Sequence, residues 1–127
     1  MKQVWYISIC LVLILLISGC TSTKELFIGN WTALQASQKV GTDEEIVRYN
    51  YWEVMENNKI SVSSFFTSME NGIETKQFDK DNKGEYEYTW NSKDEIAINN
   101  KVYKIKISKN KMTISNNNIE VTFERTD

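Results

Sequence analysis

The residues whose type and spacing could do chemistry begin with a run of carboxylates and amides, Asp79-Lys80-Asp81-Asn82-Lys83-Gly84. Oxygen-bearing side chains followed by glycine are typical of the start of a calcium loop, because Ca²⁺ prefers carboxylate and amide oxygens. Such a loop needs a bidentate glutamate at its twelfth position, where this chain has Trp90, and its fifth position is the cationic Lys83. The run therefore predicts a solvated hairpin loop, and the sequence predicts no metal site.

The other acidic groups give no stronger sign of catalysis. Asp43-Glu44-Glu45 is either a contact for a cation or partner or, as charge runs usually are, a solvated loop. Glu85 and Glu87 lie two residues apart on one strand face, where outward solvation is the default. Because the chain has no histidine, Ser-His-Asp and Cys-His nucleophiles and histidine-ligated zinc are excluded. We expect a protein that is not an enzyme and has no cofactor.

The chain has more aromatic residues than a small core needs. Tyr49-Asn50-Tyr51-Trp52 and Phe65-Phe66 place aromatic side chains on consecutive positions. Some of these side chains must point outward or into a mouth, and such amphipathic or apolar rings mark a binding surface. Tyr49, Tyr51, Trp52, Phe65 and Phe66 are therefore the candidate ligand-binding residues. For the other aromatic residues core packing is expected, namely for Trp31, Tyr86, Tyr88, Trp90, Tyr103 and Phe123.

The N-terminal twenty residues have the pattern of a targeting segment. Lys2 precedes an uncharged apolar stretch, Val4 to Ile17, which ends at Ser18-Gly19-Cys20. The stretch is shorter than the roughly 20 apolar residues that cross a bilayer. Leu16-Ile17-Ser18-Gly19-Cys20 resembles a bacterial lipobox. The resemblance implies a lipoprotein signal peptide at residues 1–19 and lipid, including palmitate, on Cys20.

This interpretation also accounts for both cysteines. Cys10 would leave with the signal peptide and Cys20 would carry the lipid, so no disulfide is expected and stability must come from an ordinary core. The mature chain would keep 14 basic and 17 acidic side chains. An acidic domain of this kind favours neither nucleic acid nor an anionic leaflet, so attachment would depend on the acyl chains. We expect residues 20–25 to form a lipidated cysteine and short tether, anchored to the cell membrane or outer membrane outside the cytoplasm.

Beyond the tether, the length fits one domain, residues 26–127, and the hydrophobic pattern has a period of two. The second half of the chain is the clearest part, because short alternating runs are separated by Asn, Gly, Ser, Asp and Lys. The apolar residues of each run share one face, as a sheet with one buried side requires. These runs are Tyr86 to Trp90, Ile96 to Ile98, Tyr103 to Ile107, Met112 to Ile114 and Ile119 to Phe123.

The first half predicts four further strands and one uncertain segment. Thr42 and Glu45 have capping-box spacing before Ile46, so Thr42 to Val47 is either a short helical piece or a charged loop. Hairpin turns are expected at Asn57-Asn58 and Asn71-Gly72. The predicted strands are Trp31 to Gln35, Val47 to Glu56, Lys59 to Met69 and Ile73 to Phe78.

These strands predict an all-β fold. About eight to nine short strands with no room for crossover helices form an antiparallel meander, and closure into a small barrel removes its exposed edges. The absence of proline suits continuous ladders.

The start of the first strand carries a family resemblance. Gly29-Asn30-Trp31 looks like the Gly-x-Trp motif of lipocalin-like, calycin-type barrels, and the layout of lipobox, meander and terminal strand is similar to that of small bacterial lipocalin-like lipoproteins. The resemblance implies a tight start of the first strand at Gly29, a Trp31 that plugs one end of the barrel, and Arg125 packed over Trp31. The chain is shorter than a full lipocalin and lacks the family's disulfide and its further signature motifs.

Two functions follow as hypotheses. The first is a membrane-anchored lipocalin-like module that binds a small apolar or amphipathic ligand in the barrel mouth. It requires an open cavity. The second is a protein-interaction lipoprotein of the cell envelope, such as an inhibitor or an immunity protein. It requires a closed core with the extra aromatic residues on an outer face.

Overall fold

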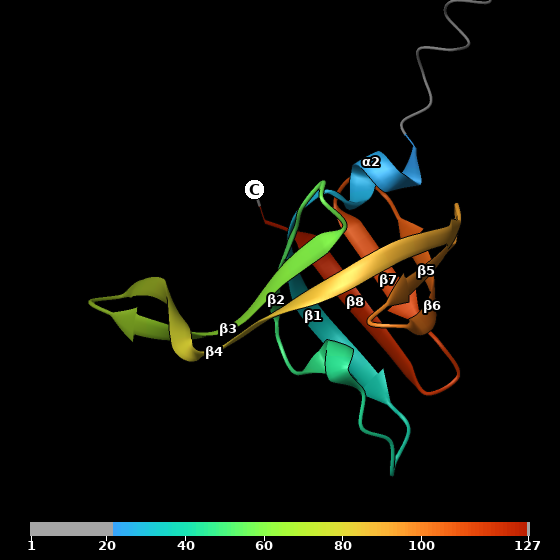
Figure 1. Ribbon diagram of the computed structural model, residues 1–127. Helices are drawn as coiled ribbons and strands as arrows, with labels where there is room; N and C mark the ends of the chain where they lie inside the picture. Colours follow the sequence, from blue (N-terminus) through green and yellow to red (C-terminus); the bar gives the residue numbers. More distant parts are fainter. Residues whose placement is uncertain (1–21, 127) are drawn as a thin grey trace, which may run out of the picture.

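The computed structural model describes residues 22–126, which form a closed antiparallel barrel of eight strands in meander order (Figure 1). Each strand pairs with its neighbour in sequence, and β8 closes the barrel by pairing with β1. The predicted all-β fold is therefore confirmed. The strands are β1 (Gly29–Gln38), β2 (Tyr51–Val54), β3 (Lys59–Glu70), β4 (Ile73–Ser92), β5 (Glu95–Ile98), β6 (Lys101–Ile107), β7 (Lys111–Ser115) and β8 (Ile119–Arg125).

The barrel interior is filled by the side chains that the period-two pattern assigned to one face. All eight strands contribute to a single cluster of buried residues, in which large aromatic and β-branched side chains predominate. Its strand members are Trp31, Trp52, Val54, Ile60, Val62, Tyr86, Tyr88, Ile96, Ile98, Tyr103, Ile105, Met112, Ile114, Ile119, Val121 and Phe123.

Short helical segments cover the two ends of the barrel. At one end α2 (Thr23–Phe27) places Phe27 in the core, with its ring 5.1 Å from that of Tyr88 and 5.5 Å from that of Trp90. Ser22 caps this helix by accepting a hydrogen bond from the backbone N–H of Glu25. The part of the expected tether that the structure describes is therefore helical, because Phe27 gains burial by docking on the barrel. Among residues 22–126 no helix is long and apolar enough to cross a membrane.

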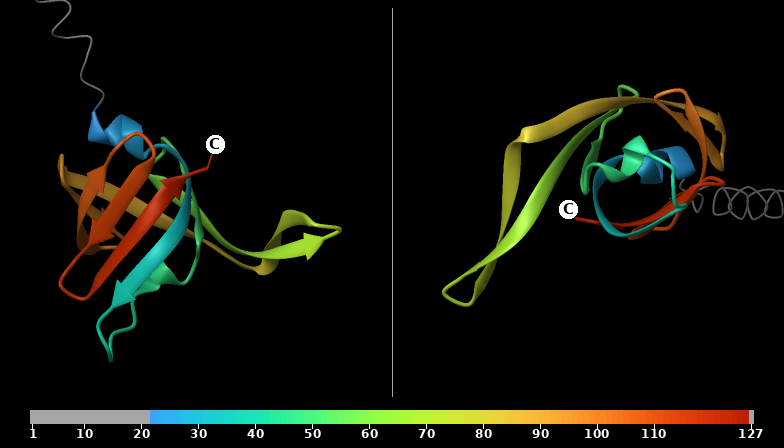
Figure 2. Two further views of the ribbon diagram at one scale, coloured as in Figure 1. Left: turned by 180° about the vertical axis from the view of Figure 1, so that it is seen from behind. Right: turned by 90° about the horizontal axis from the view of Figure 1, so that it is seen from below.

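At the opposite end lies the single-turn 3₁₀ helix η1 (Glu45–Val47) (Figure 2). Its Ile46 side chain belongs to the core. The expected helical piece is confirmed only as this turn. The capping box is not formed, because Thr42 Oγ1 donates to the carbonyl of Lys39 and the N-cap residue Glu44 makes no side-chain cap. Glu44 points instead into the end of the barrel, as described below.

One long hairpin departs from the expected short strands. The runs Ile73 to Phe78 and Tyr86 to Trp90 belong to one strand, β4, so the strand count is eight. The part of the β3–β4 hairpin formed by residues 64–83, which we call the arm, extends sideways from the barrel (Figures 1 and 2). Its turn is Asn71-Gly72, as predicted, with φ values of 53° and 77°.

We predict that α2 is held by Phe27 as a part of the core. Phe27→Ala leaves a cavity at the end of the barrel and should lower the free energy of unfolding by about 3–5 kcal/mol. Leu34→Ala is the control, since Leu34 is exposed on β1, and its effect should stay within about 0.5 kcal/mol. Urea denaturation followed by tryptophan fluorescence measures both, and equal effects would contradict the docking of α2.

Candidate functional site

Trp52, a predicted ligand-lining residue, lies in the core. Its side chain is fully buried, 4.6 Å from the ring of Phe123 and 5.8 Å from that of Tyr86. Its indole Nε1 has no hydrogen-bond partner in the described structure. The consecutive Tyr51 and Trp52 face opposite sides of β2, and it is Trp52 that takes the inward position. Trp52 therefore serves packing, and it does not line an entrance.

Tyr49 and Tyr51 lie where the arm leaves the barrel, and both are half-buried. The Tyr49 ring packs 6.0 Å from that of Tyr86, and a Cβ at Gly84 would lie 3.2 Å from the Tyr49 hydroxyl oxygen. A side chain at position 84 would thus push against this tyrosine. The absence of one lets Tyr49 cover the start of the inner half of β4.

Tyr51, Phe65 and Phe78 form an aromatic cluster at the base of the arm. Ring centroids are 6.4 Å apart for Tyr51 and Phe65, 5.2 Å for Tyr51 and Phe78, and 5.6 Å for the two phenylalanines. Lys76 Nζ lies 4.8 Å from the centroid of Phe65. The structure thus brings two of the predicted residues, Tyr51 and Phe65, together on the outside of the barrel.

The arm exposes most of its apolar side chains. The exposed fractions are 56% for Phe66, 69% for Met69, 65% for Ile73 and 47% for Phe78. Phe66 was predicted as a candidate, whereas Met69, Ile73 and Phe78 were not, because the runs Lys59 to Met69 and Ile73 to Phe78 were interpreted only as strands. The feature of the sequence that could have indicated their exposure is the length of the hairpin predicted around Asn71-Gly72.

An amide and a bulge fix the base of the arm. Asn50 Nδ2 donates to the carbonyl of Phe65, and its Oδ1 accepts from the N–H of Phe65, both at 2.9 Å. Asn50 thereby acts as one further residue of a strand beside β3. On β4 the register jumps, since Ser63 faces Lys83 and Phe65 faces Phe78. This bulge turns the arm away from the barrel wall.

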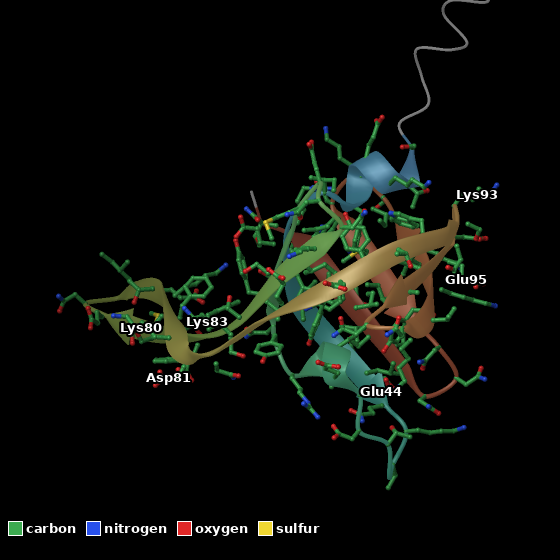
Figure 3. The ribbon with its side chains drawn as sticks, in the orientation of Figure 1. Glu44, Lys80, Asp81, Lys83, Lys93 and Glu95 are labelled. Atoms are coloured by element: carbon green, nitrogen blue, oxygen red, sulfur yellow. The ribbon has the colours of Figure 1, made fainter. Side chains whose placement is uncertain are left out.

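The bulge consists of Asp79 to Asn82, which belong to the run Asp79 to Gly84 that was expected to form a hairpin loop. It lies midway along β4 and not at a hairpin turn, so that expectation is wrong in position, although the segment is exposed (Figure 3). Asp79 Oδ1 accepts from the N–H of Asp81, and Asn82 Nδ2 donates to Ser64 Oγ at 2.9 Å. Within residues 22–126, no three acidic or cysteine side chains are grouped to hold a metal ion.

The acidic run near η1 contains the only buried charged residue of the described structure, Glu44, which is 1% exposed. Lys101 Nζ donates to Glu44 Oε2 at 2.8 Å, the Tyr103 hydroxyl to the same oxygen at 3.3 Å, and Asn118 Nδ2 to Oε1 at 3.4 Å. The hydrogen bond from Lys101 is the main reason that the pKa of Glu44 lies below its ordinary value, with desolvation opposing it. Glu44 thus ties η1 to β6 and to the β7–β8 turn.

A surface cavity of about 420 Å³ lies beside this ion pair, between η1 and the β5–β6 turn. Burial raises the pKa of Tyr86 and of Tyr103, so both hydroxyls stay protonated and donate hydrogen bonds at neutral pH. Tyr86 donates to the carbonyl of Glu45 at 2.7 Å. The cavity is lined by Asp43, Glu45, Ile46, Arg48, Tyr86, Ile98, Asn99, Asn100, Lys101 and Tyr103.

Gly29, Trp31 and Arg125 take the positions that the resemblance implied. Gly29 has a φ of 134°, which a residue with a side chain rarely adopts. The guanidinium carbon of Arg125 lies 4.3 Å from the Trp31 ring centroid, and Trp31 Nε1 donates to the carbonyl of Phe27 at 2.9 Å. Arg125 also donates to the carbonyls of Leu26, Ile28 and Lys109, so it fastens α2 to the barrel.

The predicted lipidation residue Cys20 lies outside the described residues. In comparisons with protein-family models and with curated proteins, nothing matched this chain.

We predict that Glu44 stabilises the protein in a pH-dependent way. Its pKa is lowered on folding, so its contribution is present above its ordinary pKa and is lost as the pH falls through the folded value. Glu44→Gln should lower the free energy of unfolding at pH 7 by about 1–2 kcal/mol. The loss is modest because the partner Lys101 is half exposed. Denaturation at pH 7 and near pH 3 should show that the difference in the free energy of unfolding between the variant and the wild type is smaller at the lower pH. Exposed Glu45→Gln is the control, and a pH-independent difference would refute the role.

The two buried tryptophans of β1 and β2 should respond differently to the same substitution. Trp31→Phe leaves the carbonyl of Phe27 without its donor and weakens the contact with Arg125, whereas Trp52→Phe removes an indole N–H that has no partner. Because an unsatisfied buried polar group costs about 1–3 kcal/mol, we expect Trp31→Phe to be the more destabilising by at least about 1 kcal/mol. Chemical denaturation measures both, and the reverse order would contradict this account.

Proposed function

We propose that this chain is a lipid-anchored protein of the bacterial cell envelope that binds another protein through its arm, and that it is not an enzyme. This is the second of the two hypotheses raised by the sequence, with an inhibitor or an immunity protein as examples. Three features support it, and they concern the arm, the interior of the barrel and the anchor.

The exposed arm is the observation that carries the proposal. A two-stranded ribbon alone is marginally stable in water, and both faces of this ribbon carry uncovered apolar side chains. Phe66 and Ile73 lie on one face, and Met69 and Phe78 on the other, as the cross-strand pairs require. The barrel does not cover these side chains. A partner protein that covers them supplies the missing apolar contact.

The filled interior favours a contact on the outside of the molecule. A lipocalin-like module that encloses a ligand needs space among its inward-facing side chains. Here Trp31, Trp52 and Phe123 occupy the interior, and Phe27 and Ile46 cover its two ends. The second hypothesis required such a closed core with the extra aromatic residues on an outer face. Phe66 is exposed there, as is Phe78, whereas Trp52 belongs to the core.

The anchor would set the direction in which the arm reaches. If Cys20 carries lipid, only Thr21 separates it from Ser22 at the start of α2, a span of roughly 7 Å. The α2 end of the barrel would then lie against the membrane. The arm projects sideways from the line joining α2 and η1, so it would reach along the membrane towards a neighbouring protein (Figures 1 and 2).

A photo-crosslinking amino acid at Phe66 tests the proposal in intact cells. We expect adducts with a defined envelope protein when the probe replaces Phe66. The matched control places the probe at Val102, which is similarly exposed but lies on the barrel wall in β6, and should give no such adduct. A globomycin-treated culture, in which lipoprotein signal peptides are retained, checks the anchor by a shift in mass.

The two positions together decide the result. Adducts at Phe66 that are absent at Val102 and that disappear with Met69→Ser and Ile73→Ser support binding through the arm. Equal adducts at both positions, or none at Phe66, would overturn the proposal. Far-UV circular dichroism of the variants shows whether the barrel is intact.

A small amphipathic ligand is the second candidate, and the cavity of about 420 Å³ beside η1 favours it. Its lining is mixed, with Arg48 and Lys101 beside Ile46 and Ile98, which suits a polar head with a short apolar part. Quenching of tryptophan fluorescence by a hydrophobic dye, abolished by a charge reversal at the exposed lining residue, Arg48→Glu, would support this candidate. The absence of dye binding would remove it.

A further inference from the structure

We propose that the arm of a second copy of this chain pairs with the free edge of β4. In this arrangement residues 72–78 of the two copies run antiparallel about a two-fold axis at Thr75, and the two arms form one four-stranded sheet. The inference rests on the proposed use of the arm as a contact element, and it names the first partner of that element.

The backbone of the arm has an unpaired edge on β4. Asn50 binds both the N–H and the carbonyl of Phe65, so these groups point away from β4. In an antiparallel ladder the residue opposite, Phe78, must also point outward, and so must every second residue before it. Glu74, Lys76 and Phe78 therefore present their N–H and carbonyl groups at the outer edge.

The same edge of β4 is covered from Glu87 to Ser92, whereas its outer half is not. β5 pairs with β4 only from Tyr88 to Ser92, and the side chain and N–H of Asn99 bind the N–H and carbonyl of Glu87. No described residue pairs with the backbone edge of β4 between Ile73 and Phe78. An uncovered edge of this length is a template for another strand.

The charges on this edge select a second copy in one register. Residues whose backbone groups point to the outer edge must lie opposite such residues of the other copy. The possible antiparallel alignments therefore differ from one another by a shift of two residues along one strand. Centred on Thr75, the alignment places Glu74 opposite Lys76 of the other copy and Lys76 opposite its Glu74. The neighbouring alignments place Glu74 opposite Glu74, or Lys76 opposite Lys76, and like charges directly opposite are destabilising.

The other side chains fit the same alignment. Ser68 Oγ and Thr75 Oγ1 are 3.0 Å apart within one arm, so the two copies would form a row of four hydroxyls across the sheet. Ile73 would lie opposite Gln77 of the second copy and be partly covered by its stem. The exposed apolar tip of the arm thus gains contacts in this register.

The contact is short, so it depends on concentration. Seven residues on each side give few backbone hydrogen bonds, and the pair is expected to be weak in dilute solution. Two copies anchored to one membrane by lipid on Cys20 meet at a much higher effective concentration. The test therefore uses the full chain in membranes of the expressing cells.

Cysteine crosslinking tests the register. In the proposed alignment the two Thr75 residues form a non-hydrogen-bonded pair. The Cα atoms of such a pair are about 4.5 Å apart, within the range of a disulfide. Thr75→Cys should give a crosslinked dimer under mild oxidation. Ile73→Cys and Gln77→Cys should each crosslink poorly alone and well when the two variants are co-expressed with distinguishable tags. The unsubstituted chain controls for Cys10 and Cys20.

A charge exchange in the Thr75→Cys background tests the partner. Glu74→Lys and Lys76→Glu should each lower the crosslinking yield about tenfold, because both charge pairs become repulsive. The double exchange should restore the yield, which a loss of folding would not do. No Thr75→Cys dimer, or a yield that ignores these charges, would overturn the inference.

The outcome is distinguishable from failure of the proposed function. A heterologous adduct at Phe66 without a Thr75→Cys dimer would leave protein binding through the arm intact and refute the second copy as partner. A charge-dependent dimer without any heterologous adduct would support the second copy and refute the binding of another envelope protein.

Discussion

The contact between Arg125 and Trp31 is the constraint on which the rest of the barrel depends, because it lies at the seam where the last strand meets the first. The two residues face each other in the β1–β8 register, and the guanidinium group stacks over the indole ring. Arg125 also binds the carbonyls at the end of α2, while Trp31 binds that of Phe27. The side chain of Arg125 thereby joins the last strand to the first and also holds α2 over the end of the barrel.

Closure at both ends leaves the outside of the molecule as the surface for the proposed binding. At the end opposite α2, Glu44 exchanges hydration for hydrogen bonds from Lys101, Tyr103 and Asn118, and in doing so holds η1 over the core. The interior between the two ends is occupied by the chain's own aromatic residues. A barrel of eight strands has room either for side chains or for one small ligand, and here the side chains take it.

The arm is a part of β3 and β4 that extends beyond the wall of the barrel. Beyond Ser63 the strands lose their neighbours, the bulge at Asp79 to Asn82 changes their direction, and Asn50 supplies the last pairing group on the β3 side. The aromatic cluster of Tyr51, Phe65 and Phe78 supports the base of the ribbon. The outer part is left with exposed apolar residues and an open β4 edge, which explains why partner binding is proposed there.

The sequence by itself determined most of the strands, their inward faces and the Asn71-Gly72 turn, because period-two alternation and turn residues act locally. It divided β4 into two strands and placed a hairpin loop where β4 has a bulge. The resemblance of Gly29-Asn30-Trp31 to the lipocalin-like motif implied the arrangement of Gly29, Trp31 and Arg125 at the seam. Tertiary structure alone decided that Trp52 is buried while Phe66 is exposed, and that the carboxylate of Glu44 is enclosed. Alternation reveals that a strand has two faces, but whether anything covers a face depends on residues distant in sequence. Phe78 shows this most clearly, since the sequence predicts its run only as a strand, whereas the part of β4 that carries it extends beyond the barrel and leaves it exposed.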